Sequence, residues 1–372
     1  MAHRTRWTRL LRGAALTATA ALTAVGCTSA PATSTSSSGH GTATGTAVTA
    51  AVAASAYQRI VPVVLGGGNS ALGSAALSST TDVAHVEVST AGLSARYFNV
   101  RRPAGGVMRL GTPAFYLPES ARYPQWFVAD ASVSSSTSAL AAGQKWIGAP
   151  GGIQWRSAAG HAVFLFTKAS ATASWQLSSL SKLAPGTSLP ALATDSSGHV
   201  ATVSASDSAL LAQPSFTGPL QAGVVDDGPA SPSANVVASG PLTTGIYDNE
   251  QAGLVGLTAP RGDILQWDLE GTNYQQFALR TADGGALVFY AMYLNTAVQT
   301  PASLNQSLPL SPGPAIGVSR VLAPLLGRGQ PAPRIKLEGQ QLLSFTAVDP
   351  PANGGKIQVI AIGGDWSYAS AS

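Results

Sequence analysis

A compact apolar run, His161-Ala162-Val163-Phe164-Leu165-Phe166-Thr167, stands out in a chain of 372 residues that is rich in small side chains. Short runs of bulky apolar residues bounded by turn formers are typical of a buried β-strand. A second run, Ala286-Leu287-Val288-Phe289-Tyr290, has the same character. Both runs therefore predict buried strands.

The residues that lead into the two runs also match. Arg156 to Phe166 aligns with Arg280 to Tyr290, so a turn with Gly followed by an apolar strand recurs at an offset of 124 residues. This offset is close to the length of one small domain. We interpret the match as a sign of two similar halves that meet near residue 220. Two unrelated hairpins that share Gly before an apolar strand remain the alternative.

Three other segments predict strands. Val83 to Val88 alternates between apolar and polar residues, which is typical of a strand with one covered face. The segments 341–348 and 356–362 are apolar, and the Pro, Asn and Gly residues between them cannot continue a strand. These two segments therefore predict a C-terminal hairpin.

One helix is predicted before the strands. Val48 to Ile60 is rich in Ala and Val, and Pro62 is expected to end the helix, so that Val61 to Leu65 forms a separate short run. Segments rich in Pro, Gly and Ser, such as 218–241, interrupt any regular alternation of strands and helices.

The N-terminus has the parts of an export signal. Arg4, Arg6, Arg9 and Arg12 precede an apolar stretch, Gly13 to Gly26. At about 14 residues this stretch is too short for a helix that spans a bilayer, so it predicts a cleaved signal rather than an anchor.

Cys27, the single cysteine of the chain, follows Leu22-Thr23-Ala24-Val25-Gly26. This sequence resembles the bacterial lipobox, although Ala24 stands where leucine is commoner. The resemblance implies that a diacylglycerol is attached to the Cys27 sulfur and that cleavage before Cys27 leaves a lipidated N-terminus, held at the outer face of the cytoplasmic membrane by acyl chains. An ordinary secretory signal with a cysteine nearby is the alternative.

The residues after Cys27 predict a flexible tether and two domains. Almost all residues up to position 47 are small or Pro, and such a segment has too little apolar surface to offset the entropy of ordering. The predicted organisation is a lipoprotein signal peptide (1–26), a linker (27–47), a first domain (48–220) and a second domain (221–372).

Charge and cysteine content exclude several classes of function. Four of the 21 Lys and Arg residues lie in the signal, which leaves 17 against 17 Asp and Glu in the mature chain. A neutral protein lacks the basic face with which nucleic-acid readers displace counterions. One cysteine also excludes a disulfide framework and a zinc site built from several cysteines.

No motif predicts a cofactor, a metal or an active site. Gly66-x-Gly68-x-x-Ala71 fits a relaxed dinucleotide pattern, but a plain loop is the favoured interpretation. Ser179-Leu180-Ser181-Lys182 has the spacing of an acylation motif but lacks its companion Lys-Thr-Gly. The three histidines of the folded part, His85, His161 and His199, contain no metal-binding helical pair. The acidic Asp248-Asn249-Glu250 is interpreted as a turn.

Several segments together resemble a family of uncharacterised actinobacterial surface lipoproteins. They are Tyr123 to Ala129, Trp175-Gln176-Leu177 with Leu189-Pro190, and Leu279 to Phe289, and the likeness runs over most of residues 80 to 370. The resemblance implies an α+β fold in two similar halves. We expect each half to be a curved, mainly antiparallel sheet packed by helices, similar to the NTF2-like fold. The family transfers no active site.

Three aromatic residues form a candidate pocket. Tyr123, Trp126 and Phe127 would supply apolar area with a polar rim, and the alternative is that they belong to the core. The favoured hypothesis is a non-enzymatic, lipid-anchored protein that binds an envelope component or a small ligand, or scaffolds an envelope protein. The alternative hypothesis is an envelope hydrolase whose site is assembled from distant residues.

Overall fold

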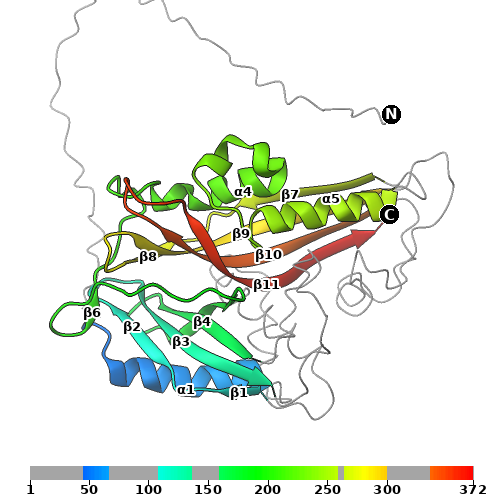
Figure 1. The fold of residues 1–372 in the computed structure, drawn as a ribbon. Helices are drawn as coiled ribbons and strands as arrows, with labels where there is room; N and C mark the ends of the chain where they lie inside the picture. The colour runs from blue at the N-terminus through cyan, green and yellow to red at the C-terminus, as the bar shows by residue number, and fades with distance from the viewer. Residues whose placement is uncertain (1–44, 67–107, 136–158, 259–263, 300–335, 372) are drawn as a thin grey trace, which may run out of the picture. The chain divides into compact units, whose positions relative to one another are not determined.

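The computed structural model describes residues 45–66, 108–135, 159–258, 264–299 and 336–371 (Figure 1). The fold is mixed α+β, as predicted, and it is dominated by strands. Its α-helices in the described ranges are α1 (Ala50–Gly66), α4 (Thr217–Asp227) and α5 (Thr244–Thr258), with short 3-10 turns η2 (Pro214–Phe216), η3 (Gly228–Ala230) and η4 (Pro232–Asn235). None of the described helices is both long and apolar enough to span a membrane.

The strands form one sheet in the order β6-β2-β3-β4-β5-β11-β10-β9-β7. All pairs between these strands are antiparallel except β2 with β6. Two further strands pair off this path, β1 with β3 and β8 with β9. The strands are β1 (Met108–Leu110), β2 (Ala114–Pro118), β3 (Gln125–Ser135), β4 (Ala159–Lys168), β5 (Gln176–Leu183), β6 (His199–Val200), β7 (Ile264–Gly271), β8 (Phe277–Arg280), β9 (Ala286–Gln299), β10 (Lys336–Asp349) and β11 (Gln358–Ala371).

The pairing between β5 and β11 is short. Only Leu183 and Lys182 of β5 pair with β11, opposite Ala361 and Ile362. The neighbouring pairs are far longer, and β10 pairs with both β9 and β11 over most of its 14 residues. The β5–β11 junction therefore joins two larger groups of strands.

Helix α1 covers the strands before this junction. Ala53, Ala56, Tyr57 and Val61 are buried and recur at the spacing of one helix face. The Tyr57 ring meets the Phe164 ring edge-on at 5.5 Å between centroids. Behind it, the rings of two further buried residues stack at 4.5 Å, those of Phe127 from β3 and Phe166 from β4.

The prediction that Pro62 ends this helix is wrong, because α1 continues to Gly66. A proline inside a helix removes one backbone hydrogen bond and disturbs one turn. Val61, directly before it, is fully buried against the strands. Packing of the apolar face thus outweighs the local penalty, since most helical stability in proteins comes from such packing.

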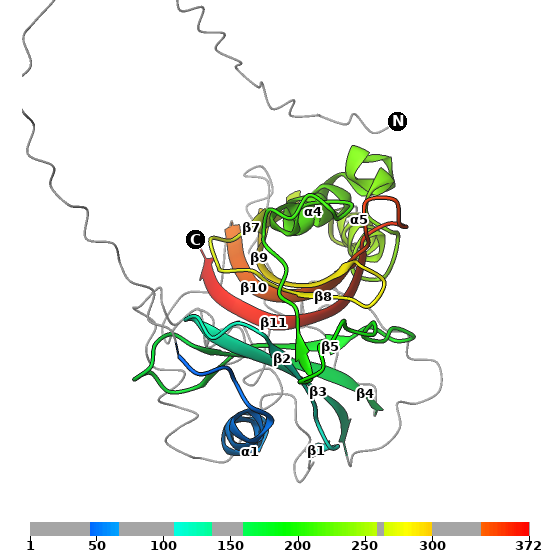
Figure 2. The same ribbon diagram turned by 90° about the vertical axis from the view of Figure 1, so that its left-hand side faces the viewer.

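Helices α4 and α5 lie inside the curve of β7, β9, β10 and β11 (Figure 2). Alternate residues of β9, from Ala286 to Leu294, point to this concave face and form a core with the two helices. Gln221 of α4 accepts a hydrogen bond from the Tyr290 hydroxyl at 2.9 Å. Asp226, near the end of α4, accepts one from the backbone N–H of Leu269 at 2.9 Å, which ties α4 to β7.

A third core lies between the two groups of strands, on the faces of β3, β4 and β9 that point away from the helices. It joins Trp126 and Val128 of β3 and Val163 and Leu165 of β4 with side chains from β8, β9 and β11. The rings of Trp126 and Phe277 are 4.9 Å apart. Consecutive residues of a strand alternate between faces, so β3 contributes Trp126 to this core and Phe127 to the α1 core.

Most predicted elements are found where the pattern placed them. The runs 161–167 and 286–290 lie in β4 and β9, and the C-terminal hairpin is the β10–β11 pair. Val83 to Val88 lies outside the described residues. The Pro- and Gly-rich segment 218–241 contains most of α4, and the acidic residues 248–250 lie inside α5 rather than in a turn, so the turn prediction is wrong there.

Glu250 of α5 makes the stability of the fold depend on pH. Its side chain is buried, and burial together with the negative charge of Asp226 raises the pKa of Glu250 from 4.5 to about 8. Between these pH values the folded state binds one proton more than the unfolded state. The protonated Glu250 therefore stabilises the fold fully below pH 4.5, the pKa of the unfolded state. This stabilisation is lost as the pH rises through about 8, the pKa of the folded state, by up to about 1.4 kcal/mol per pH unit.

We expect Glu250→Gln, which keeps the shape of the protonated acid, to flatten this dependence. Urea unfolding of the full chain should be compared between about pH 6 and pH 8, because burial raises the pKa of Asp349 to about 6 and that group accounts for the lower range. The exposed Asp248 of the same helix provides the matched control, Asp248→Asn. Equal slopes in the wild type and in Glu250→Gln would contradict the assignment.

Candidate functional site

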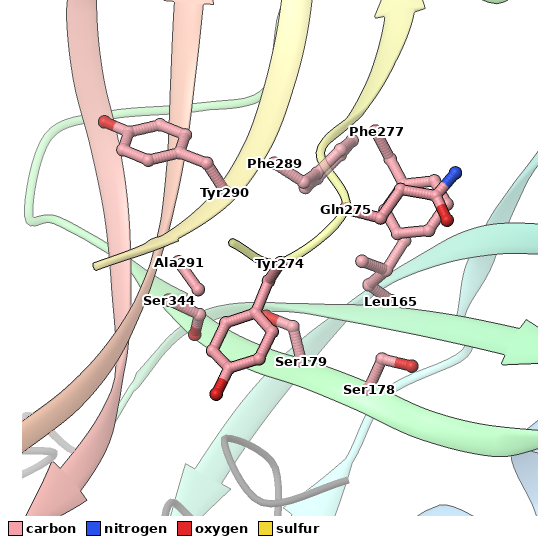
Figure 3. Close-up of a pocket in the computed structure, with 10 residues that line it drawn as sticks. All are labelled: Leu165, Ser178, Ser179, Tyr274, Gln275, Phe277, Phe289, Tyr290, Ala291 and Ser344. Atoms are coloured by element: carbon pink, nitrogen blue, oxygen red, sulfur yellow. The ribbon is translucent and has the colours of Figure 1, made fainter. Parts of the chain in front are cut away.

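A small pocket opens between the strands of the two groups. Its residues come from β4, β5, β9, β10 and the segment around the start of β8 (Figure 3). We call it the Tyr274 pocket; it is lined by Leu165, Ser178, Ser179, Tyr274, Gln275, Phe277, Phe289, Tyr290, Ala291 and Ser344.

A β-bulge shapes one wall of the pocket. Leu165 of β4 pairs with Ser179 of β5, but the next residue, Phe166, pairs with Leu177, so that Ser178 is the extra residue of β5. Bulges redirect side chains, and here two consecutive serines contribute to one lining. The Ser178 hydroxyl is hydrogen-bonded to the buried Thr167 hydroxyl.

Tyr274 forms the opposite wall. Its hydroxyl is 2.7 Å from the Tyr293 hydroxyl, and the two rings meet edge-on. Burial and this hydrogen bond raise the pKa of Tyr274 above its ordinary value. The phenol therefore stays neutral at physiological pH and offers a hydrogen-bonding group rather than a base. The Tyr290 ring points away from the other lining side chains, toward α4 (Figure 3).

Ser344 supplies an unpaired polar group in the pocket lining. The residue is 2% exposed, and its hydroxyl oxygen has no hydrogen-bond partner. A buried hydroxyl without a partner loses its hydrogen bonds to water and gains none in return. A ligand group that donates to or accepts from Ser344 would recover this loss.

The size and lining of the pocket favour recognition of a small group. Its volume is about 30 Å³, well below the several hundred Å³ of sites that enclose a whole drug-sized ligand. Leu165, Phe277 and Phe289 are apolar, and the polar lining residues are Ser, Tyr and Gln. No Asp, Glu, His, Lys or Arg lines it, so it offers neither a general base nor a charged ligand group.

The three aromatic residues singled out in the sequence do not line one cavity. Phe127 packs in the α1 core and Trp126 on the other face of β3, against the Phe277 ring that forms part of the Tyr274 pocket. Tyr123 lies close to Gly45, before the first helix. Adjacent strand residues point to opposite faces, so Trp126 and Phe127 cannot share a pocket.

The Ser, His and Asp residues do not assemble a nucleophile in the described ranges. Ser179 and Lys182 of the acylation-like motif lie on a strand, and Lys182 packs against Gly160 while Ser179 faces the Tyr274 pocket. His161, predicted at the start of a buried strand, has an exposed ring whose Nδ1 is 2.9 Å from Asp130. Cys27, His85 and the Gly66 to Ala71 motif lie outside the described residues, apart from the backbone of Gly66.

One local cluster brings Asp195, Ser197 and His199 together. The Ser197 hydroxyl is 2.7 Å from Oδ1 of Asp195 and 2.7 Å from Nδ1 of His199. A carboxylate only accepts, so Ser197 donates to Asp195, and these bonds hold the pKa of Asp195 below its ordinary value. The serine proton points to the aspartate and not to the histidine, which is the arrangement of an exposed turn rather than of an activated nucleophile.

Among the residues that the structure describes, no three His, Cys, Asp or Glu side chains come together at a spacing that could hold a metal ion. Two polar residues of the pocket lining, Tyr274 and Ser344, had no sequence signal. Tyr274 follows a polar turn and Ser344 is an ordinary residue of a strand pattern, and neither stands out before distant strands are brought together.

Comparisons with known proteins identify relatives by sequence. A protein of Streptomyces avermitilis named "Uncharacterized lipoprotein" is 28% identical over 197 residues, which cover 51% of this chain and 50% of that protein. The chain thus matches about half the length of this curated relative. No solved structure matches the chain.

A family model covers a larger part of the sequence. The model described as "Domain of unknown function (DUF8094)" matches residues 69–365, which is more than half of the chain. Together with the Streptomyces relative, this match confirms the resemblance to uncharacterised actinobacterial lipoproteins. The chain belongs to the family defined by the DUF8094 domain.

Proposed function

We propose that this chain is a lipid-anchored protein of the cell envelope. Its folded part, held at the outer face of the cytoplasmic membrane, binds an envelope component or a small ligand through the Tyr274 pocket, or scaffolds an envelope protein. The lipobox-like residues before Cys27 support the anchor, and so does the name of the Streptomyces relative, a lipoprotein.

The hydroxyl of Ser344 carries the binding proposal. It is an unpaired polar atom in a lining that is otherwise apolar or uncharged. Apolar walls with a few placed polar groups are the usual composition of ligand sites. The alternative, an envelope hydrolase, would need a base within reach of a serine in such a cleft, and no group of that kind lines the Tyr274 pocket.

We propose further that the chain has two similar domains with NTF2-like curved sheets. The predicted boundary between residues 48–220 and 221–372 falls inside α4 (Thr217–Asp227), which packs with the second group of strands, so we place the boundary before this helix. Two of the three cores support this division, one under α1 and one under α4 and α5, whereas the third core joins strands of both groups. The short β5–β11 pairing supports it as well, because only two residues of each strand are paired there.

Photo-crosslinking in intact cells tests the pocket. A benzophenone amino acid placed at Gln275, an exposed lining residue, should yield an adduct of defined mass. We expect Ser344→Ala to reduce this adduct about tenfold, because one buried hydrogen bond contributes roughly 1.4 kcal/mol. Mass spectrometry of the purified adduct distinguishes a small ligand from a protein.

The same crosslinker at the exposed Ser170, in the turn between β4 and β5, is the matched control and should not yield this adduct. An adduct that forms equally at Ser170, or that is unchanged by Ser344→Ala, would reject binding by the Tyr274 pocket. Persistence of a protein adduct in Ser344→Ala would instead favour scaffolding through another surface.

A further inference from the structure

The lining of the Tyr274 pocket changes with depth. Ser344 and Phe289, at its base, are 2% and 3% exposed. Tyr274 and Ser179 are half-buried, and Gln275 is exposed at the rim (Figure 3). A ligand that reaches Ser344 therefore inserts one end into the pocket and leaves its remainder in solvent beside Gln275.

The inserted end must be small. The pocket volume is about 30 Å³, which is close to the share of one water molecule in the liquid. A sugar ring or an aromatic ring does not fit into this volume. A methyl group with a polar atom beside it can reach Ser344 while the rest of the ligand stays in the mouth.

The inserted end must also be neutral. No Asp, Glu, His, Lys or Arg lines the pocket. A carboxylate or an ammonium group that leaves water without an opposite charge loses far more than one hydrogen bond recovers. The lining therefore rejects anions and cations alike.

The base of the pocket has two chemical sides. Phe289 and Leu165 are apolar, whereas the Ser344 hydroxyl has no hydrogen-bond partner. A plain alkyl end would leave this hydroxyl unpaired, and a plain hydroxyl end would place its oxygen against apolar side chains. An acetyl end matches both sides, because its methyl group and its carbonyl oxygen are attached to the same carbon.

The half-buried part of the lining offers further hydrogen bonds. The hydroxyls of Tyr274 and Tyr293 share one bond, which uses one of their two protons, so this pair keeps a donor. A carbonyl oxygen has two lone pairs, and the N–H of an amide adds a donor, for which Ser179 and Gln275 supply acceptor oxygens. An acetyl group attached to nitrogen therefore uses the lining more fully than an acetyl ester.

We propose that the Tyr274 pocket recognises a neutral acetamido group at the end of its ligand. The Ser344 hydroxyl donates to the acetyl oxygen, and the methyl group packs against Phe289. The remainder of the ligand, an amino sugar or an amino-acid residue, stays outside the pocket. Recognition of this group rests on the binding function proposed above for the same pocket and specifies the chemical class of its ligand.

Saturation-transfer NMR of the full chain tests this proposal with three methyl glycosides of the same ring. The glycoside of N-acetylglucosamine carries the acetamido group, that of glucose has a hydroxyl in its place, and that of glucosamine has an ammonium group. We expect only the first to bind, with the strongest saturation at its acetyl methyl protons. N-acetylalanine amide carries the same group without a sugar ring, so its relative affinity shows whether a sugar or a peptide is the better source.

Ser344→Ala removes the donor at the base of the pocket. We expect it to weaken binding of the N-acetylglucosamine glycoside about tenfold. Ser367→Ala is the matched control, because Ser367 is exposed on β11 and donates to the backbone oxygen of Gln340 outside the pocket. Loss of an unpaired hydroxyl should leave the midpoint of thermal unfolding of Ser344→Ala unchanged or raise it, so weaker binding does not reflect unfolding.

Ala291→Val provides a second variant that keeps Ser344. Ala291 is a half-buried lining residue, and two added methyl groups should fill much of so small a pocket and abolish binding. Equal saturation of the glucose glycoside, or an acetyl methyl signal that survives both Ser344→Ala and Ala291→Val, would overturn recognition of the acetamido group.

The crosslinked adduct at Gln275 separates this inference from the function on which it rests. An adduct that depends on Ser344 but contains no acetamido group would overturn the ligand class and leave the pocket as a binding site. Absence of that adduct together with absence of binding by every probe would refute the binding function itself, with ordered water as the partner of Ser344.

Discussion

Replacing Gly363 by alanine should lower the free energy of unfolding by about 3 kcal/mol, at the upper end of the cost of overfilling a core. A Cβ atom at Gly363 would lie 1.8 Å from the backbone oxygen of Leu180 in β5 and 2.8 Å from the Ser344 hydroxyl. The Leu180 oxygen belongs to a strand and cannot rotate away. Gly363 directly follows the two-residue junction of β11 with β5, so relief of the clash must separate these strands.

Urea unfolding monitored by circular dichroism measures this loss. Gly355→Ala is the matched control, because a Cβ at Gly355 meets nothing within 4 Å, and its effect should stay within about 0.5 kcal/mol. We expect the Gly363→Ala transition to be broader as well, since each group of strands has a core of its own besides the third core that the two groups share. A variant as stable as the Gly355→Ala protein would contradict the close approach of β11 to β5.

Replacing Cys27 by serine should transfer the protein from the membrane fraction to the soluble fraction of cells. A serine hydroxyl in place of the thiol removes the atom to which the lipid is proposed to be attached. Each buried methylene of an acyl chain contributes about 0.8 kcal/mol to membrane binding. Two acyl chains therefore hold a protein on the membrane, and a protein without them is released. Fractionation together with mass spectrometry of the N-terminal peptide, after metabolic labelling with a fatty acid, measures both location and acylation.

Thr28→Ser changes the adjacent residue and serves as the control, with acylation and membrane binding retained. A wild-type N-terminus without acyl mass, combined with a Cys27→Ser protein that remains in the membrane fraction, would refute the anchor. Intact precursor in the cytosol would refute export altogether.

Elements with a strong local pattern were predictable from the sequence. The runs at 161–167 and 286–290 are strands, and the C-terminal hairpin was placed correctly, because contiguous apolar residues bounded by turn formers have few other structures available. Helix α4 was not predicted, since Gly218 and Pro219 are poor helix formers. Its core-facing residues, such as Val224 and Val225, are fully buried, and this tertiary packing offsets the poor propensity.

The candidate sites were not predictable in the same way. Trp126 and Phe127 are neighbours in the chain but lie in different cores, because strand geometry separates adjacent side chains. Glu250 was interpreted as part of a turn, whereas it is buried in α5 beside Asp226. Burial of a carboxyl group and of its neighbours depends on which helix covers which face of the sheet.

Local chemistry along the chain was therefore enough to predict the main strands, and it is the basis on which the export signal and the lipidation of Cys27 are proposed, because each of these features is a property of consecutive residues. The tertiary structure alone brought Tyr274 to Ser344 and Trp267 to Thr296 and Gln341. Strand pairing and curvature act over long distances in sequence. A buried serine or glutamine without a hydrogen-bond partner costs free energy only because segments far apart in the sequence together exclude water from it.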